Sequence, residues 1–187
     1  GDGGGLYVST ENKDVVVEIL SGAIRNNTSK GSGGALAVVG VVGGCDNITV
    51  TFGVNKDHTD INECDHGKGD IHSYTCPVIE FNESSKSGGA IYITGGKSTK
   101  LNLYCLEETQ NSVSDVESRS HFMMVEGGTV VISTLENNQL GTPATYGHNT
   151  INNSIHVTAG AMDLYGSMAN PKIDAPITVD IKSDEDH

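Results

Sequence analysis

The chain has 187 residues, of which 24 are glycine and none is tryptophan, and its formal net charge is −13 at pH 7. This acidity, which is densest in the tail at 182–187, repels nucleic acid and anionic lipid, so neither is an expected partner. No apolar run approaches the roughly 20 residues of a membrane-spanning helix, so no membrane insertion is expected. Short runs of valine, isoleucine, leucine and tyrosine between glycine, asparagine, serine and threonine predict an all-β chain with little helix.

Five six-residue blocks along the chain align without gaps. Each reads small, glycine, small, apolar, variable, apolar, and they begin at Gly3, Gly33, Gly88, Gly127 and Ala159. In an extended strand the two apolar positions point to the same side, which makes that side a repeated interior face. The blocks predict two neighbouring buried columns: Leu6, Leu36, Ile91, Val130 and Met162 in one, and Val8, Val38, Ile93, Ile132 and Leu164 in the other.

A second shared element ends six residues before three of these blocks. It ends in asparagine each time and occupies residues 24–27, 79–82 and 150–153. Further alternating or apolar segments at 15–19, 48–52 and 101–105 give each repeat about three strands. Stacked repeats would pair these strands in parallel and bury a continuous apolar column. Asn27, Asn82 and Asn153 are predicted to form a ladder of turn asparagines from repeat to repeat.

These motifs carry a family resemblance. The Gly-Gly-Ala blocks at 33–36 and 88–91 and the asparagine elements resemble the GGA(I/L/V) and FxxN motifs of polymorphic outer membrane protein repeats, and more loosely other pectin-lyase-like surface proteins. Isoleucine or threonine replaces the phenylalanine of FxxN, and the block at Gly127 has no asparagine at the expected distance. The resemblance implies a right-handed parallel β-helix, which the repeats extend over about five coils as one segment of a larger protein, residues 1–187.

The long interval between the blocks at Gly33 and Gly88 predicts an inserted loop at 53–76. Its oxygen-bearing side chains suit calcium, and the candidate ligands are Asp57, Asp60, Asn62 and Glu63. Residues 60–64 resemble the start of a calcium-binding EGF module, but that module requires more cysteines than the two in this loop. A solvated loop without a cofactor is therefore the favoured interpretation, and calcium is the alternative.

The chain has four cysteines without CxxC spacing, which favours disulfides over zinc: Cys45, Cys64, Cys76 and Cys105. Aligning 48–52 with 101–105 places Cys105 beside Phe52 and leaves Cys45 roughly 20 Å away at ~3.3 Å per residue. A disulfide spans about 4.4 to 6.8 Å between Cα atoms, so a bond between Cys45 and Cys105 is not expected. Each should pair with Cys64 or Cys76, and Cys76 is the preferred mate of Cys105.

Asn-X-Ser/Thr sequons begin at five asparagines: Asn26, Asn27, Asn47, Asn82 and Asn152. In a eukaryotic secretory context these are candidate glycan sites. An asparagine whose amide is stacked in a ladder cannot carry a glycan, so Asn27 and Asn82 are expected to stay unmodified. Asn47, Asn152 and Asn26 remain the candidates, and Asn47 is the best placed.

Catalysis has little support in the sequence. A glycan-cleaving β-helix needs carboxylates roughly 5 to 10 Å apart on adjacent coils. The predicted outward positions of the blocks contain no such pair: Tyr7, Ala37, Tyr92, Val131 and Asp163. The favoured function is therefore a non-catalytic structural or adhesive segment of a secreted or cell-surface protein, such as a filamentous appendage. Its expected partners are other coils or subunits and host or matrix glycans or proteins. The alternative is a carbohydrate-binding or polysaccharide-degrading module.

Overall fold

The computed structural model describes residues 1–10, 13–43, 47–53, 77–104, 106–115, 120–133, 149–151, 153–165, 172–173 and 177–179. Every regular element in these ranges is a β-strand, and none is a helix. A search of the same ranges for a helix long and apolar enough to cross a bilayer finds none. The prediction of an all-β chain is confirmed for this part of the molecule.

The strands form three sheets. The largest contains β1 (Leu6–Ser9), β2 (Val15–Ile19), β5 (Leu36–Val39), β6 (Ile48–Phe52), β9 (Ile91–Thr94), β10 (Thr99–Leu103), β13 (Met123–Ser133), β15 (Ile155–Tyr165) and β17 (Ile177–Val179). The second contains β3 (Ala23–Arg25), β7 (Val78–Glu80), β11 (Leu106–Thr109), β14 (Asn149–Ile151) and β16 (Lys172–Ile173). The third contains β4 (Thr28–Ser29), β8 (Glu83–Ser84) and β12 (Ser112–Val113). Each strand pairing described is parallel.

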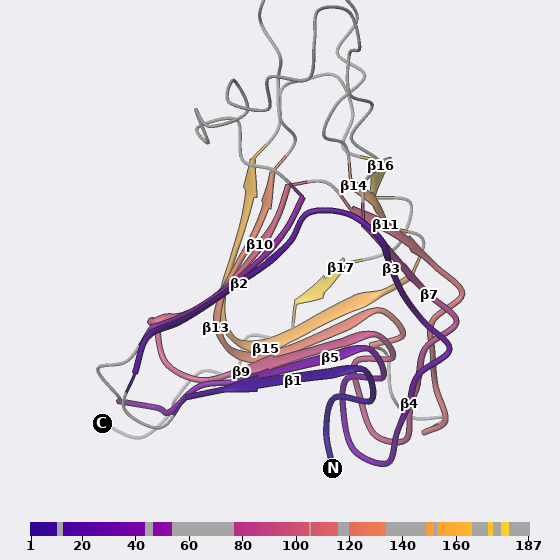
Figure 1. Ribbon diagram of the computed structural model, residues 1–187, viewed down its shortest axis with the longest axis horizontal. Helices are drawn as coiled ribbons and strands as arrows, with labels where there is room; N and C mark the ends of the chain where they lie inside the picture. Colours follow the sequence, from indigo (N-terminus) through magenta and orange to yellow (C-terminus); the bar gives the residue numbers. More distant parts are fainter. Residues whose placement is uncertain are drawn as a thin grey trace, which may run out of the picture.

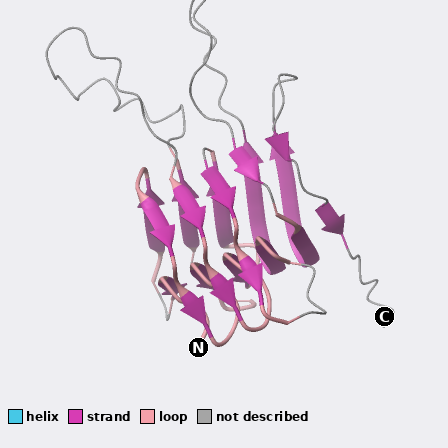
Figure 2. Cartoon of the chain, turned by 90° about the vertical axis from the view of Figure 1, so that its right-hand side faces the viewer, coloured by secondary structure: helices cyan, strands magenta, loops and turns pink. Residues whose placement is uncertain are grey.

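Successive passes of the chain lie on top of one another, and we call each pass a tier. Tier 1 is β1–β4, tier 2 is β5–β8, tier 3 is β9–β12, tier 4 is β13 and β14, and tier 5 is β15 and β16. Seen down the stack, the tiers form three sides: β1, β5 and β9 lie on side 1, β2 and β10 on side 2, and β3, β7 and β11 on side 3 (Figure 1). Side views show the strands stacked in rows (Figure 2). The sheets thus curl into a nearly barrel-shaped wall.

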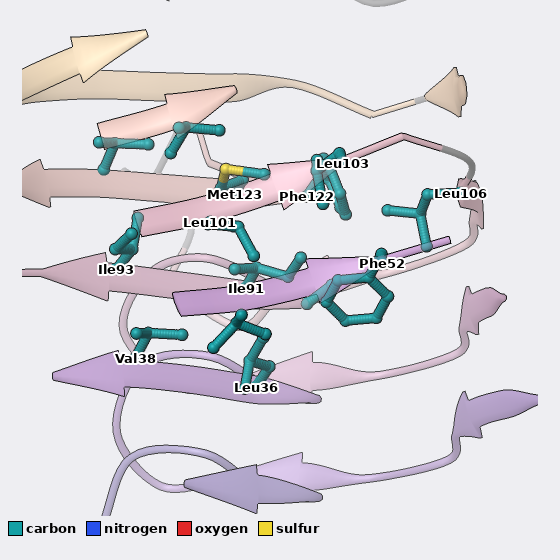
Figure 3. Packing of buried hydrophobic residues seen from close by; sticks show 14 of the residues in the cluster. Leu36, Val38, Phe52, Ile91, Ile93, Leu101, Leu103, Leu106, Phe122 and Met123 are labelled. Atoms are coloured by element: carbon teal, nitrogen blue, oxygen red, sulfur yellow. The ribbon is translucent and has the colours of Figure 1, made fainter. Parts of the chain in front are cut away.

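The core lies inside this wall and is built by alternation. Leu36 and Val38 on β5 and Ile91 and Ile93 on β9 point inward, while the residues between them point outward. They meet the inward residues of side 2, among them Phe52, Leu101 and Leu103 (Figure 3). All of these side chains are fully buried. Burying each one stabilises the fold by about 1.5–3 kcal/mol relative to leaving it exposed.

The predicted columns are right for the first three blocks and wrong for the last two. Leu6, Leu36 and Ile91 are register partners, and so are Val8, Val38 and Ile93. The next partners of Ile91 and Ile93 are Met123 and Val125, at the start of β13. Val130 and Ile132 instead pair with Leu101 and Leu103 on side 2, and Met162 and Leu164 continue that column.

The glycines of the fourth block explain this error. Gly127 and Gly128 form the corner where β13 passes from side 1 to side 2. A Cβ atom on Gly127 would lie 2.5 Å from the backbone oxygen of Gly95, and Gly128 has a φ of +80°. Backbones that approach closely and positive φ values both require glycine. Since the same requirement arises at the corner before side 1, a glycine pair followed by an alternating strand does not reveal which side follows.

A second register prediction is also wrong. Ile48 pairs with Thr99 and Phe52 with Leu103, so strands β6 and β10 are offset by two residues from the predicted alignment. A shift of two leaves every side chain on the same face, so apolar alternation cannot detect it. Phe52 therefore lies opposite Leu103 and not opposite Cys105. The four cysteines and the loop at 54–76 lie outside the described residues, so the disulfide pairing stays a prediction.

Replacing Ile91 with aspartate should prevent cooperative folding or lower the free energy of unfolding by about 4 kcal/mol or more. The change removes a fully buried aliphatic side chain and puts a carboxylate into the core. Lys100→Asp is the matched control, because Lys100 is exposed on β10, and it should change stability by less than about 1 kcal/mol. Urea denaturation followed by circular dichroism measures both, and similar losses in the two variants would contradict the inward assignment.

Candidate functional site: the asparagine corner

The corner that follows side 3 repeats the same backbone conformation in tiers 1 to 3. Its first residue has a positive φ in each tier, 56° at Asn26, 54° at Phe81 and 54° at Gln110. The residues that follow these are Asn27, Asn82 and Asn111. Bulky side chains strongly disfavour positive φ, yet Phe81 adopts it with its side chain 48% exposed. Contacts made by the asparagines therefore determine the corner more than the local preference of the preceding residue does.

These asparagines form a ladder along the stack. The backbone N–H and Nδ2 of Asn27 both donate to Oδ1 of Asn82, at 3.1 and 3.0 Å. The same two groups of Asn82 donate to Oδ1 of Asn111, at 3.0 and 2.9 Å. Nδ2 of Asn82 also reaches the backbone oxygens of Ile24 and Glu80. Asn82 is 0% exposed, and its polar groups are satisfied by these bonds.

Glu108 continues the ladder inside tier 3. Its register partners are Ile79 and Ile151, so its carboxyl group points inward where the neighbouring tiers have isoleucine, and it is 1% exposed. Oε1 accepts from Nδ2 of Asn111 and from Nδ2 of Asn153, both at 2.7 Å, and Oε2 accepts from the backbone N–H of Asn153 at 3.0 Å. A buried carboxyl group is tolerated there because donors surround it.

The polar cluster of Glu108, Asn111 and Asn153 lies where the third sheet ends. In tiers 1 to 3 the corner leads into a short strand, whereas β14 is separated from β15 only by residues 152–154. Among the described strands, β12 is the last member of the third sheet. Glu108 therefore connects the asparagine ladder of tiers 1 to 3, which include a strand of the third sheet, to Asn153 between β14 and β15, where no such strand is described. Glu108 and Asn111 are buried in this cluster, and Asn153 is half-buried.

The prediction of the ladder was right for Asn27 and Asn82 and incomplete for the rest. Asn111 was missed because the connection from it to β13 is longer than the connections from Asn27 to β5 and from Asn82 to β9. No asparagine therefore stands six residues before the glycine block at Gly127. Asn153 joins the ladder through Glu108 and not directly through another asparagine. The element containing Asn153 is also offset by one residue, since Ile151 aligns with Ile79 through Glu108. A glutamate in a column of isoleucines breaks the apolar alternation, so the sequence pattern did not predict that Glu108 is buried. The spacing of the asparagines did not predict it either.

The sequon asparagines differ in how accessible their amides are. Asn82 is enclosed in the ladder and Asn27 is half-buried with its Nδ2 donating to Asn82. Asn26 is exposed at its corner, and Asn47 is exposed at the start of β6, where its Nδ2 donates to Asp14 at 3.1 Å. Asn152 lies outside the described residues. The geometry is therefore compatible with a glycan on Asn47 or Asn26 and not on Asn82.

The outward columns also differ from the prediction. On side 1, Tyr7, Ala37 and Tyr92 are followed by Met124 and His156. Val131 and Asp163 instead belong to side 2, in a column whose other members are Glu18, Thr51 and Asn102. This misplacement has the same cause as the misplaced inward columns, the glycine corner within β13. The members of each outward column differ in size and charge from tier to tier.

Tyr92 makes the best-defined contact on the outside of side 1. Its hydroxyl donates to Oε2 of Glu126 at 2.7 Å, and Tyr7 lies on the same side two tiers away with its side chain 51% exposed. Burial raises the pKa of Tyr92 above its ordinary value, and the hydrogen bond and charge of Glu126 raise it further. The phenol therefore stays protonated and serves as a donor.

The two carboxylates in the outward column of side 2 lie too far apart to flank one glycosidic bond. Glu18 and Asp163 share a column but are separated by four tiers, about 19 Å at roughly 4.8 Å per strand. Three or more His, Cys, Asp or Glu side chains do not come together in a metal-binding group within the ranges described. The calcium candidates Asp57, Asp60, Asn62 and Glu63 lie outside them, so that site stays a prediction. The chain matches no family model, no curated protein and no solved structure.

Replacing Asn82 with alanine should lower the free energy of unfolding by about 2–4 kcal/mol. The change removes the acceptor for Asn27 and the donor to Ile24 and Glu80, and it leaves buried backbone groups without partners. Asn102→Ala is the matched control, since the half-buried Asn102 makes a single 3.3 Å bond to Thr51, and it should cost less than about 1 kcal/mol. Equal losses in urea denaturation would show that the ladder adds little stability.

Replacing Glu108 with isoleucine tests the polar cluster against the apolar pattern. The isoleucines in neighbouring tiers suggest that this change stabilises the core. We expect it to destabilise the protein by about 2 kcal/mol or more, because Asn153 loses the acceptor of its Nδ2 and backbone N–H, and Asn111 loses one of the three oxygens to which its Nδ2 donates. Glu108→Gln keeps one acceptor oxygen and should lose less. Thermal and urea unfolding measure the order of stability, and a variant with isoleucine that is as stable as the wild type would contradict this role.

Proposed function

We propose that the chain is a right-handed parallel β-helix segment with a structural or adhesive role outside the cell. The parallel tiers around one core support this architecture, and the strong right-handed preference of parallel crossovers supports its hand. Five tiers correspond to the coils of the solenoid. On this proposal the glycine blocks and asparagine corners are repeats of the polymorphic outer membrane protein type.

The observation that carries the functional proposal is a contrast between the two faces of the wall. The inward column of side 1 keeps its apolar chemistry from tier to tier, as Leu36, Ile91 and Met123 illustrate. The outward column of side 2 does not keep one chemistry, since Glu18 is followed by Thr51 and Asn102. Repetition inside serves stacking, and variation outside suits a scaffold that contacts partners over a broad surface.

The external contacts would be made by the tyrosine-bearing outside of side 1. Tyr7 and Tyr92 offer aromatic surface with a polar tip, which suits contacts with proteins or glycans, and Glu126 fixes the orientation of Tyr92. A carbohydrate-binding role of the same face is the second candidate. It is favoured by the fixed Tyr92 hydroxyl, whereas the carboxylates of Glu18 and Asp163 on side 2 lie too far apart for cleavage.

Expression through a eukaryotic secretory pathway tests the extracellular assignment and the accessibility of the sequons together. We expect folded, secreted protein with glycan on the Asn47 peptide and none on the Asn82 peptide. Mass spectrometry of the peptides measures this, and an Asn47→Gln variant provides the control for assignment. Glycan on Asn82 of the folded protein, or retention of misfolded chain in the cell, would contradict the proposal.

Incubation with a panel of polysaccharides, including uronic-acid polymers, separates the structural role from the catalytic alternative. We expect no new reducing ends or unsaturated products above those formed by heat-unfolded protein. Product that increases in proportion to folded protein would overturn the non-catalytic assignment. Binding without turnover that is lost in Tyr92→Ala and kept in Lys100→Ala would favour the carbohydrate-binding candidate.

A further inference from the structure

The corner that follows side 3 holds an exposed aromatic side chain in an unfavourable backbone conformation. Phe81 has a φ of 54° and is 48% exposed. Tiers 1 and 3 have the polar residues Asn26 and Gln110 at this position, and asparagine adopts positive φ more readily than a bulky residue does. The corner therefore forms without a phenylalanine. Both the conformation and the exposure of Phe81 are costly unless its ring gains a contact.

Asn26 is the neighbour of Phe81 one tier away. The strands that precede them, β3 and β7, pair in parallel on side 3 with Arg25 opposite Glu80 (Figure 1). The backbone N–H of Asn26 continues this pairing by donating to the oxygen of Glu80 at 3.3 Å. Asn26 and Phe81 therefore occupy equivalent positions, about 4.8 Å apart across the strand spacing. Both are exposed, so a group attached to the Asn26 amide would lie within reach of the Phe81 ring.

The amide of Asn26 is also available for modification. Its sequon is completed by Thr28, which is exposed. The Nδ2 groups of Asn27 and Asn82 donate within the corner, and that of Asn47 donates to a neighbouring carboxylate. The Nδ2 of Asn26 makes no hydrogen bond to the residues that the structure describes. A glycan on Asn26 therefore displaces no hydrogen bond and leaves the asparagine ladder intact.

We propose that Phe81 is the platform for an N-linked glycan on Asn26, whose first N-acetylglucosamine packs on the phenylalanine ring. The C–H groups and the acetyl methyl group of this sugar form an apolar face that suits an aromatic ring, while its hydroxyl groups stay in water. Attachment forms a bond between Nδ2 of Asn26 and C1 of the sugar. It breaks the bond from C1 to the pyrophosphate of a lipid-linked oligosaccharide, which receives the Nδ2 proton. The inference rests on the extracellular role in the proposed function and assigns a ligand to Phe81.

Secretion of the full chain from eukaryotic cells that keep their glycans rich in mannose tests the inference. Thr28→Ala removes the sequon of Asn26, leaves the overlapping sequon of Asn27 intact, and gives the protein without this glycan. We expect glycan mass on the Asn26 peptide. In urea denaturation, the equilibrium constant for unfolding should be roughly three- to tenfold lower with the glycan than in Thr28→Ala. Trimming the glycan to its first sugar with an endoglycosidase should preserve this difference, because that sugar contacts the ring.

The effect of the glycan is then measured in three further backgrounds, each with and without Thr28→Ala, so that the cost of this change itself cancels. With Phe81→Ala the glycan should still be attached, but its effect on the unfolding constant should fall below about twofold. Phe81→Tyr keeps an aromatic ring and should keep the effect. Val42→Ala is the matched control, because it shortens an 82% exposed apolar side chain between β5 and β6, and it should leave the effect unchanged.

Two results would overturn the inference and leave the proposed function intact. One is folded, secreted protein whose Asn26 peptide carries no glycan. The other is a glycan on Asn26 that stabilises the protein equally with phenylalanine and with alanine at position 81. Retention of misfolded chain in the cell would instead contradict the proposed function, and the inference would fail with it.

Discussion

Parallel pairing between equivalent strands of successive tiers is the constraint on which the rest of the structure depends. Each strand obtains its hydrogen bonds from the tiers before and after it, so no tier satisfies its own backbone. The same pairing places Leu36 over Ile91 and Val50 over Leu101, which turns a short alternating pattern into continuous apolar columns. Stability therefore accumulates through contacts between neighbouring tiers.

The corners fix how wide each tier is. Glycine is required where backbones approach closely, as at Gly127, and asparagine bonds the corner of one tier to the corner of the next. Tier 4 changes the cross-section because the chain passes from β14 to β15 without a short strand. Glu108 enters the isoleucine column at that place and joins Asn111 to Asn153. The buried carboxyl group of Glu108 thus accepts hydrogen bonds from the amides of Asn111 and Asn153 where the cross-section changes. An apolar side chain in its place would not accept these bonds.

The sequence was sufficient to predict the strand class, the parallel columns of the first three blocks and the ladder at Asn27 and Asn82, because period-two alternation and asparagine spacing report directly on stacking. It was insufficient at three places for physical reasons. Glycine pairs mark two different corners, so Val130 was assigned to the wrong side. A two-residue shift preserves every face, so Phe52 was aligned with Cys105 and not with Leu103. Glu108 replaces isoleucine inside the core, and no pattern based on hydrophobicity anticipates it.

Two of these three failures share a feature. Each lies where the interior departs from strict repetition, Val130 after the corner within β13 and Glu108 next to the place where the third sheet ends at β12. Tiers with identical corners would all have the same width, so a change of corner between tiers 3 and 4 alters the shape of the wall there. Tyr92 and Glu126 join side 1 across the same two tiers. The hydrogen bond between Tyr92 and Glu126 on the outside of the wall therefore lies at the same height as the irregularity of its interior.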